Sequence, residues 1–223
     1  MNSMQKVKRF ACIAIILINL NMTDLSHPVT LSGRIIELIP LERTHFDDLL
    51  ALSKDIRIWQ HYAMEGHDTF KMTQSLETAL LEREKGTQYA FVIIQKEDNK
   101  IIGSTRLLDI QKEHQKLEIG WTWMHPDYWA KNINTECKFL LLEYCFENLG
   151  CTRVQLRTDE NNIRSRKAIE KTGAQFEGII RNDMIRNNGT KRNSAYYSII
   201  DSDWLRVKQR LLFLLALPEK GYL

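Results

Sequence analysis

Cysteine, proline and glycine are scarce in this chain of 223 residues, which contains four, four and ten of them respectively. So little glycine and proline excludes collagen-like and low-complexity chains, and the 43% of hydrophobic residues excludes intrinsic disorder. The cysteines form no C-x-x-C pair, and no histidine stands at zinc-finger spacing from them, so no zinc site is expected. Cys137, Cys145 and Cys151 lie in or just after one apolar stretch, and we interpret them as reduced, buried thiols.

A large excess of charge of either sign is also missing. The 31 Lys and Arg residues nearly cancel the 28 Asp and Glu residues, and a net charge of +3 is too small to indicate a nucleic-acid partner. The chain needs no disulfide to stabilise its core, because one domain of this size buries roughly 70–75% of the surface of the extended chain. We therefore expect one weakly basic domain over residues 23–223, in a reducing, cytoplasmic compartment.

The N-terminal apolar run is too short to span a membrane. Phe10–Leu20 contains 11 residues, whereas a spanning helix needs about 20. Basic residues precede this run, as in a secretory signal, but no A-x-A cleavage pattern follows it. We interpret residues 1–22 as a disordered leader or a mis-assigned start, with Met22 as the alternative first residue. A genuine export signal or membrane anchor over residues 6–20 stays open as the alternative; otherwise no membrane partner is expected.

From residue 31 onward, the hydrophobic periodicity predicts strands and helices without an intervening linker or repeat. Strand, helix, strand and helix follow one another between residues 117 and 173, which implies a parallel pair of strands with a right-handed crossover. The remaining strands are predicted to form hairpins. The expected fold is a mixed α/β (α+β) domain with one central, mostly antiparallel sheet flanked by helices. The predicted strands are 33–40, 89–95, 101–109, 117–123, 153–158, 176–186 and 192–200, and the predicted helices are 44–52, 72–85, 134–148, 162–173 and 203–215.

The predicted strand 117–123 alternates strictly between two kinds of residue. Side chains of a strand point to opposite faces in turn, so this alternation defines two sets. Glu118 is expected to point away from the tryptophans and to be accessible to a ligand. One face carries Leu117, Ile119, Trp121 and Trp123, and the other carries Glu118, Gly120 and Thr122.

The common enzyme signatures are missing, including H-E-x-x-H, G-x-S-x-G, the P-loop and G-x-G-x-x-G. What remains is the polar segment Tyr128–Glu136, between this strand and an apolar helix. A short loop that leads into a helix presents free backbone N–H groups and the positive end of the helix dipole, which together bind phosphate. Asn132 and Asn134 are suited to the left-handed conformations that such a loop needs. The alternative is an ordinary helix start, capped by Asn134 or Thr135.

The segment Asp159–Ser165 repeats this arrangement after the next predicted strand. Asn162 is predicted to cap the following helix, and Ser165 lies one turn further on. Two parallel strands that each lead into a helix would place two donor-rich helix ends at the same sheet edge, where open α/β sheets bind ligands. Basic residues gathered here either hold phosphates or form a solvated face; they are Arg153, Arg157, Arg164, Arg166 and Lys167.

Several of these segments, in this order, resemble the GNAT (general N-acetyltransferase) superfamily. The closest resemblance is to its branch of ribosomal-protein N-terminal acetyltransferases, and it covers residues 31–212. It implies a GNAT fold in which strands 117–123 and 153–158 splay apart, with acetyl-CoA as co-substrate in the wedge between them. The segments are the EIGWTW strand, HPDYW, the KNINTE loop, the apolar helix, DENNIRSRKAIEKTGA and FEGIIRN…NNGTKRNSAYYSII.

The resemblance also implies which residues contact acetyl-CoA. In the family, the wedge strand pairs with the pantetheine arm, the following loop binds the pyrophosphate, and an Asn at the next helix contacts the arm. The chain departs from the family where Ala130 and Asn132 replace usual glycines and where Ile169 replaces a Tyr common outside this branch. The corresponding residues are Trp121, Thr122 and Trp123 for the arm, Ala130, Lys131, Asn132, Ile133, Asn134 and Thr135 for the pyrophosphate, and Asn162.

The expected reaction is direct attack of a primary amine on the acetyl thioester. An amine with a pKa near 8–10 is mostly protonated at neutral pH, so it must first lose a proton. Glu118 is the candidate base, directly or through water, and Ser165 is the candidate donor or positioning group for the leaving thiolate. No metal is expected, because the six histidines are scattered in polar turns.

The acceptor amine is left open between a protein N-terminus and a small amine such as a polyamine, an aminoglycoside-like compound or a metabolite. By the resemblance, its cleft is lined by Trp59, His61, Tyr62 and Met64. Two other functions stay open: a non-catalytic binding module of GNAT fold and a nucleotide-binding regulatory domain. The oligomeric state is also open, with a homodimer among the options.

Overall fold

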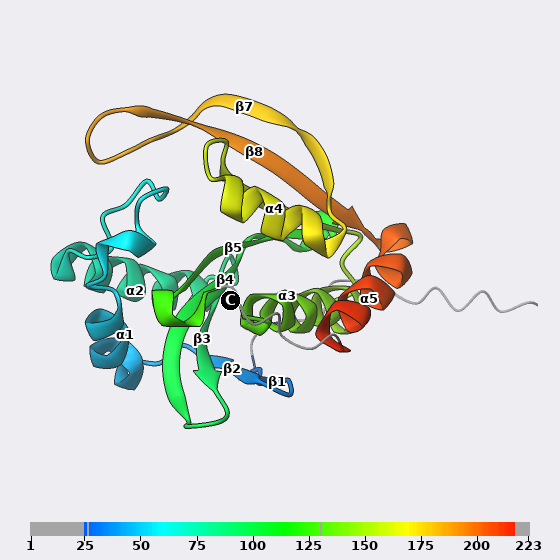
Figure 1. Cartoon of the computed structure of the whole chain (residues 1–223), viewed down its shortest axis with the longest axis horizontal. Helices are drawn as coiled ribbons and strands as arrows, with labels where there is room; N and C mark the ends of the chain where they lie inside the picture. Colours follow the sequence, from blue (N-terminus) through cyan, green and yellow to red (C-terminus); the bar gives the residue numbers. More distant parts are fainter. Residues whose placement is uncertain (1–24, 26, 130, 217–223) are drawn as a thin grey trace, which may run out of the picture.

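One eight-stranded sheet forms the centre of the molecule, with helices on both of its faces (Figure 1). The computed structural model describes residues 25, 27–129 and 131–216. The strands lie in the order β1-β2-β3-β4-β5-β6-β8-β7, and each neighbouring pair is antiparallel except β5 and β6. Their bounds are β1 Leu31–Ser32, β2 Ile36–Pro40, β3 Tyr89–Gln95, β4 Lys100–Gln111, β5 Lys116–Met124, β6 Arg153–Asp159, β7 Gln175–Ile185 and β8 Lys191–Ile200.

The helices form two groups, one on each face of the sheet (Figure 1). α1 (Phe46–Leu52) and α2 (Thr69–Glu84) cover one face near β2 to β4. The opposite face is covered by α3 (Ile133–Glu143), α4 (Ile163–Thr172) and α5 (Asp201–Ala216). Short helical turns connect these elements at Arg43–His45, Ile56–Ile58, Lys112–His114 and Pro126–Tyr128, and a π-helical turn, Tyr144–Asn148, continues α3.

Each face of the sheet has its own hydrophobic core. Tyr89, Phe91 and Ile93 of β3 belong to the core under α3 and α5, whereas Ala90 and Val92 belong to the core under α1 and α2. Burial on both faces explains why this strand is a continuous apolar run instead of an alternating one. β5 lies where both cores meet.

The predicted mixed α/β class, with one mostly antiparallel sheet, is confirmed, and the predicted helices and strands lie within a few residues of those observed. The two-residue strand β1 is absent from the predictions. The strand predicted over 33–40 begins only at Ile36, because the chain bends at Arg34 and Ile35. The N–H groups of that bend donate to the carboxylate of Glu136 in α3.

The leader, a membrane-spanning helix and a metal site can be compared with the structure only over its described residues. The predicted leader, residues 1–22, lies outside the described residues. Among the residues that are described, no helix combines the length and the apolar character needed to cross a membrane. Over the same residues, no three His, Cys, Asp or Glu side chains come together in a way that could hold a metal ion.

The three cysteines of the described chain are free and buried, as predicted. Burial raises the pKa of Cys137 to about 11 and also raises the pKa of Cys145. Only about a thousandth of a thiol with a pKa of 11 is ionised at pH 8, and the thiolate is the reactive form. We therefore expect iodoacetamide at pH 8 to alkylate Cys137 at least about 100-fold more slowly in the native than in the urea-unfolded protein. Peptide mass mapping measures both rates, and equal rates would contradict the burial of this thiol.

Candidate functional site

β5 and β6 are paired over only three positions and then separate. The pairs are Lys116 with Arg153, Leu117 with Val154, and Glu118 with Gln155. Beyond Glu118 both strands continue, β5 to Met124 and β6 to Asp159, with no pairing between them. The splayed parallel pair that the family resemblance implies is therefore present. We refer to the space between the two diverging segments as the gap.

A β-bulge in β5 lies beside the gap. Trp121 and Thr122 of β5 together stand opposite the single residue Thr105 of β4. Trp121 has a φ of 50°, in the left-handed region, where a residue other than glycine costs about 1–2 kcal/mol. Bulges of this kind interrupt the ladder and redirect the side chains beyond them.

The bulge also changes which core each side chain of β5 enters. Leu117 and Ile119 pack in the core under α3, but Trp123 packs in the core under α1 and α2. Trp121 lies on that second side as well, with its ring 5.9 Å from the ring of Tyr62. The prediction that both tryptophans share the face of Leu117 and Ile119 is wrong, because one extra residue shifts the alternation. Glu118 comes before the bulge and points to the opposite side from Leu117 and Ile119. It therefore lies on the same side as the tryptophans.

Thr122 is predicted to share the face of Glu118, but the structure places it on the opposite side, toward α3. Its hydroxyl accepts a hydrogen bond from Nζ of Lys138 at 2.7 Å and lies 2.7 Å from the hydroxyl of Thr105. Lys138 is a charged residue within the apolar run of α3, and burial lowers the pKa of its ammonium group. Lys138 is not among the predicted site residues, although a lysine within an apolar helical run is a visible signal.

The edge of β5 that faces the gap carries backbone groups. The N–H of His125 donates to the carbonyl of Ile102 in β4 at 2.9 Å, so by the alternation of backbone groups the N–H and C=O of Met124 point the other way, into the gap. Nε1 of Trp129 donates to the carbonyl of Met124 at 2.9 Å. The hydroxyl of Tyr62 donates to the carbonyl of Thr122 at 2.8 Å. The N–H of Met124 is thus a donor directed at the gap.

α3 begins at one end of the gap. Its first intrahelical hydrogen bond runs from the N–H of Glu136 to the carbonyl of Asn132 at 2.9 Å. The N–H groups of Ile133, Asn134 and Thr135 precede that bond and therefore have no partner within the helix, and the positive end of the helix dipole lies among them. Lys131 adds an exposed ammonium group next to this helix start.

Two details of this loop differ from the predictions. Asn132 is the N-cap residue with φ −67° and ψ −3°, and neither it nor Asn134 has a positive φ. The expectation of left-handed asparagines is wrong because the helix begins already at Ile133, which places Asn134 and Thr135 inside the first turn instead of at the cap. Ala130, the remaining predicted residue of this loop, lies outside the described residues.

α4 begins on the other side of the gap. The side-chain oxygen of Asn162 accepts a hydrogen bond from the N–H of Ser165 at 3.0 Å, so the predicted cap is confirmed. Ser165 is half-buried in the first turn. The guanidinium group of Arg164 lies 3.6 Å from the ring centroid of Trp129, whose Nε1 bonds the end of β5. The start of α4 therefore contacts Trp129, which in turn bonds the end of β5.

Glu118 occupies the last paired position before β5 and β6 separate, so its carboxylate lies at the apex of the gap. The side chain is buried, and its two oxygens accept hydrogen bonds from Nε2 of Gln155 and Nε of Arg157, each at 3.0 Å. A Cβ atom at position 120 would lie 2.8 Å from Oε1 of Glu118, so Gly120 keeps the space beside this oxygen open. The contact with Arg157 is also an ion pair, so this carboxylate lies beside a fixed positive charge.

The predicted acceptor-side residues lie along the same stretch of β5. The ring of Trp59 is 5.4 Å from that of Trp123, and Tyr62 contacts the bulge as described. The segment that carries them reaches the turn between β7 and β8, where the N–H of Asn187 donates to the carbonyl of Ala63 at 3.1 Å (Figure 1). This segment, β5 and the β7–β8 hairpin together enclose the side of the sheet onto which Glu118 points.

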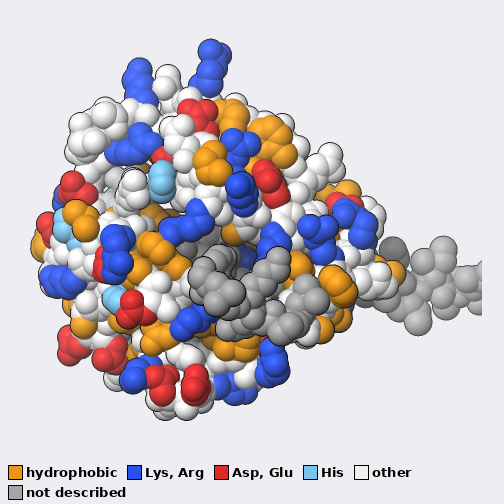
Figure 2. Space-filling view, in the orientation of Figure 1, with side chains coloured by type: hydrophobic (Ala, Val, Ile, Leu, Met, Phe, Trp, Pro, Cys, Tyr) orange, Lys and Arg blue, Asp and Glu red, His pale blue; other side chains and the backbone are white. Residues whose placement is uncertain are grey.

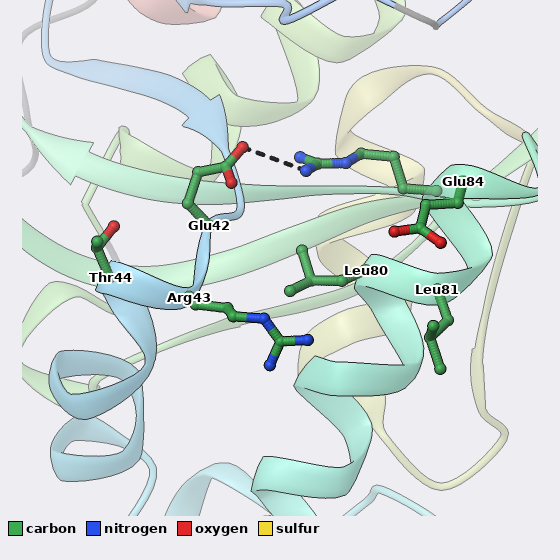
Figure 3. Close-up of a pocket in the computed structure, with 7 residues that line it drawn as sticks. Glu42, Arg43, Thr44, Leu80, Leu81 and Glu84 are labelled. Carbon is green, nitrogen blue, oxygen red and sulfur yellow. Dashed lines mark hydrogen bonds and ion pairs between the residues drawn. The ribbon is translucent and has the colours of Figure 1, made fainter.

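A separate pocket lies between the start of α1 and the end of α2 (Figure 3). An ion pair between Arg83 and Glu42, with an N–O distance of 3.2 Å, crosses it. The pocket shares no residue with the gap, and none of the predicted site residues lines it. The residues that line it are Glu42, Arg43, Thr44, Leu80, Leu81, Arg83 and Glu84.

Comparisons with known proteins agree with this geometry. Residues 36–175 match the family model described as "Acetyltransferase (GNAT) domain". The chain is 25% identical over 178 residues to "Probable N-acetyltransferase YjcK" of Bacillus subtilis (strain 168), covering 78% of this chain and 98% of the relative. It is 31% identical over 107 residues to "Putative ribosomal N-acetyltransferase YdaF" of the same organism, covering 48% of this chain and 57% of the relative. The crystal structure of a GCN5-related N-acetyltransferase from Brucella melitensis superposes with a TM-score of 0.79 at 27% identity, covering 88% of this chain and 89% of that one.

Proposed function

The chain belongs to the GNAT acetyltransferase family and is an N-acetyltransferase, and we propose that it transfers the acetyl group of acetyl-CoA to a primary amine by direct attack. The observation that carries this proposal is the gap between β5 and β6, which has a helix start on each side. A narrow gap edged by backbone donors suits a long, flexible ligand arm, and a helix N-terminus at its end suits a diphosphate.

The residues around the gap fit the parts of acetyl-CoA. The N–H groups of Ile133, Asn134 and Thr135, with Lys131 beside them, would bind the diphosphate. The N–H of Met124 would bind a carbonyl of the pantetheine arm as it lies along Trp121, Thr122 and Trp123. Asn162 would contact the arm from the other side, through its Nδ2, because its Oδ1 already accepts the bond that caps α4.

We assign the proton transfers to two side chains. Glu118 at the apex of the gap accepts a proton from the ammonium group of the substrate, directly or through one water molecule, which leaves the neutral amine that attacks. The amine nitrogen then bonds to the acetyl carbonyl carbon, and the carbon–sulfur bond breaks. Backbone N–H groups on the edge of β5 stabilise the negative charge that develops on the carbonyl oxygen. Ser165 donates its hydroxyl proton to the leaving thiolate and takes up the proton that the nitrogen loses as the amide forms, or it positions the thiolate.

The direct test measures binding and turnover with the same preparation. We expect acetyl-CoA at 100 times its dissociation constant to stabilise the protein by about 2.7 kcal/mol in a thermal-shift experiment. We also expect release of the CoA thiol when amines from a panel are added. A shift without thiol release from any amine would favour the non-catalytic binding module. A shift with ATP or NAD but not with acetyl-CoA would favour a nucleotide-binding domain, and either result would overturn the proposal.

Asn132→Asp is expected to affect helix stability and CoA binding in opposite directions. A carboxylate at the N-cap interacts favourably with the helix dipole, so the free energy of unfolding should rise by about 0.3–1 kcal/mol. The same negative charge lies beside the proposed diphosphate site, so CoA affinity should fall at least about fivefold at low salt. Urea denaturation and isothermal titration calorimetry measure the two effects.

The matched control for this experiment is Gln74→Glu, which makes a comparable change of charge at an exposed position of α2. It should leave CoA affinity unaltered. If Asn132→Asp bound CoA as tightly as the wild type did, the diphosphate would not lie at the start of α3.

A further inference from the structure

Three arginines on the acceptor side of β5 have no carboxylate partner among the described residues. They are Arg106 of β4, Arg164 of α4 and Arg192 of β8. All three lie close enough to Tyr62 for their charges to act on its phenol: burial raises the pKa of Tyr62, and the three positive charges oppose that rise. The hydroxyl of Tyr62 donates to the carbonyl of Thr122 in the bulge, so these three charges act close to the part of β5 that borders the gap.

Arg192 is the most unusual of the three. The residue is only 8% exposed, and the Nε of its side chain has no hydrogen-bond partner among the described residues. Its hydrogen bond within the described part of the chain is a long one, 3.5 Å from Nη1 to the carbonyl of His61. Buried polar groups are almost always hydrogen-bonded, so this buried guanidinium N–H is a candidate donor to a ligand.

Arg106 is also buried, at 4% exposed, and its guanidinium group bonds only neutral acceptors. Nη1 donates to Oε1 of Gln88 at 3.0 Å, and Nη2 donates to the hydroxyl of Ser75 at 2.9 Å. The group lies 4.7 Å from the ring centroid of Trp121 in the bulge. A positive charge is thus held next to the wedge strand without a negative charge to balance it.

The charges of Asp159 and Asp183 reach Arg192 and oppose the lowering of its pKa by burial, but these carboxylates, like Glu118, form ion pairs with other arginines. Glu118 binds Arg157, and Asp159 binds Arg186. Asp183 is shared between Arg157 and the hydroxyl of Tyr196. Burial lowers the pKa of His61, so this side chain adds neither a compensating nor an additional charge at neutral pH. Arg106, Arg164 and Arg192 therefore add positive charge on this side of β5 that forms no ion pair with a described carboxylate. In the view of Figure 2, Lys and Arg side chains lie beside a hollow in the middle of the molecule.

We propose that the acceptor is a small amine that carries an anionic group, a carboxylate or a phosphate, and that Arg192 and Arg106 bind this group while the amine lies at the apex of the gap. This inference rests on the proposed transfer reaction. The planar guanidinium group suits the paired oxygens of both anions, whereas polyamines and aminoglycosides would be repelled. The contact between Ala63 and Asn187 encloses Arg192 between the loop and the hairpin, which favours a small acceptor over a protein chain.

The test compares matched amines in the thiol-release assay: glutamate with glutamine amide, in which both carboxylates are neutral amides, O-phosphoethanolamine with ethanolamine, and spermidine as a cationic amine. In one of the two pairs we expect kcat/KM to be at least about tenfold higher for the anionic amine than for its neutral partner. A preference in the first pair identifies the anion as a carboxylate, and a preference in the second pair identifies it as a phosphate. Arg192→Gln should remove this preference, so its kcat/KM should fall at least about tenfold more for the anionic amine than for its neutral partner, and Arg192→Lys should restore part of the preference. Lys191→Gln, which removes an exposed charge from the neighbouring position, should keep the preference.

The proposal would be overturned if neutral or cationic amines had a kcat/KM equal to or higher than that of the anionic amines. It would also be overturned if Arg192→Gln lowered kcat/KM equally for all amines. Turnover confined to a peptide N-terminus would overturn it as well. If no amine released thiol, the proposed function would fail while the anion site would still be tested by calorimetry. In that case glutamate or O-phosphoethanolamine should bind the wild type and not Arg192→Gln, and binding of neither compound to the wild type would refute the site. Far-ultraviolet circular dichroism of each variant confirms folding.

Discussion

Glu118→Gln is expected to lower kcat for acetyl transfer by about 10²–10³-fold at pH 7 and to leave acetyl-CoA affinity within about twofold. Gln has the same shape and still accepts a hydrogen bond, but it cannot take the proton that the ammonium group must lose. In the variant only the fraction of amine that is already neutral can react. The rate of the variant should therefore rise about tenfold per pH unit up to the pKa of the amine, with a flatter profile for the wild type.

Initial rates of thiol release between pH 6 and 10 measure both profiles. The control is Glu177→Gln in β7, which removes a partly exposed carboxylate that forms an ion pair with Arg153 of β6, outside the gap. Its kcat should stay close to that of the wild type. Wild-type rates in Glu118→Gln across pH 6–9 would exclude Glu118 as the base and leave its ion pair with Arg157 as a purely structural contact.

Glu136→Ala is expected to lower the free energy of unfolding by about 4 kcal/mol. The carboxylate of Glu136 is buried and accepts three backbone hydrogen bonds, from the N–H groups of Arg34 at 2.8 Å, Ile35 at 2.7 Å and Ile36 at 2.8 Å. Each hydrogen bond to a charged group contributes about 1.5–3 kcal/mol, and the alanine would leave these donors without an acceptor. A Cβ atom on Gly33 would lie 2.5 Å from Cδ of Glu136, so this glycine makes room for the carboxylate.

Urea denaturation, with the midpoint and slope compared between variants, measures this loss. Glu136→Gln keeps one acceptor oxygen and should lose about half as much. Glu143→Gln, in the same helix, removes only a partly exposed ion pair with Lys208 and should cost less than about 1 kcal/mol. A similar loss in Glu136→Ala and Glu143→Gln would show that the three backbone bonds contribute little to stability.

The elements of this fold could be predicted because their periodicities are strong and their ends carry local signals. Asn162 caps α4 through its own side chain, and Gly173 ends that helix with a φ of 101°, as the sequence indicates. The bulge could not be predicted in this way. Trp121 and Trp123 fit an uninterrupted alternation with Leu117, and only the pairing with β4 reveals the extra residue.

The candidate site was predictable only in its local parts. The loop at the start of α3 and the cap at Asn162 follow from neighbouring residues, whereas the arginine cluster is assembled from three distant elements. A charged Arg106 within an apolar strand was visible, but nothing in the sequence places it near Arg192. The same limit applies to Glu136, whose partners at Arg34 and Ile35 lie about a hundred positions earlier.

The alternation of β5 does not require the extra residue. If Trp121 were removed, the residues that point toward α3 and those that point toward α2 would keep their sides. A chain one residue shorter could thus pair with β4 in a regular ladder, at the loss of the contacts that the Trp121 ring makes with Tyr62 and Arg106. We propose that this inserted amino acid, held in an unfavourable conformation, is retained because it shapes the edge of β5 for the ligand.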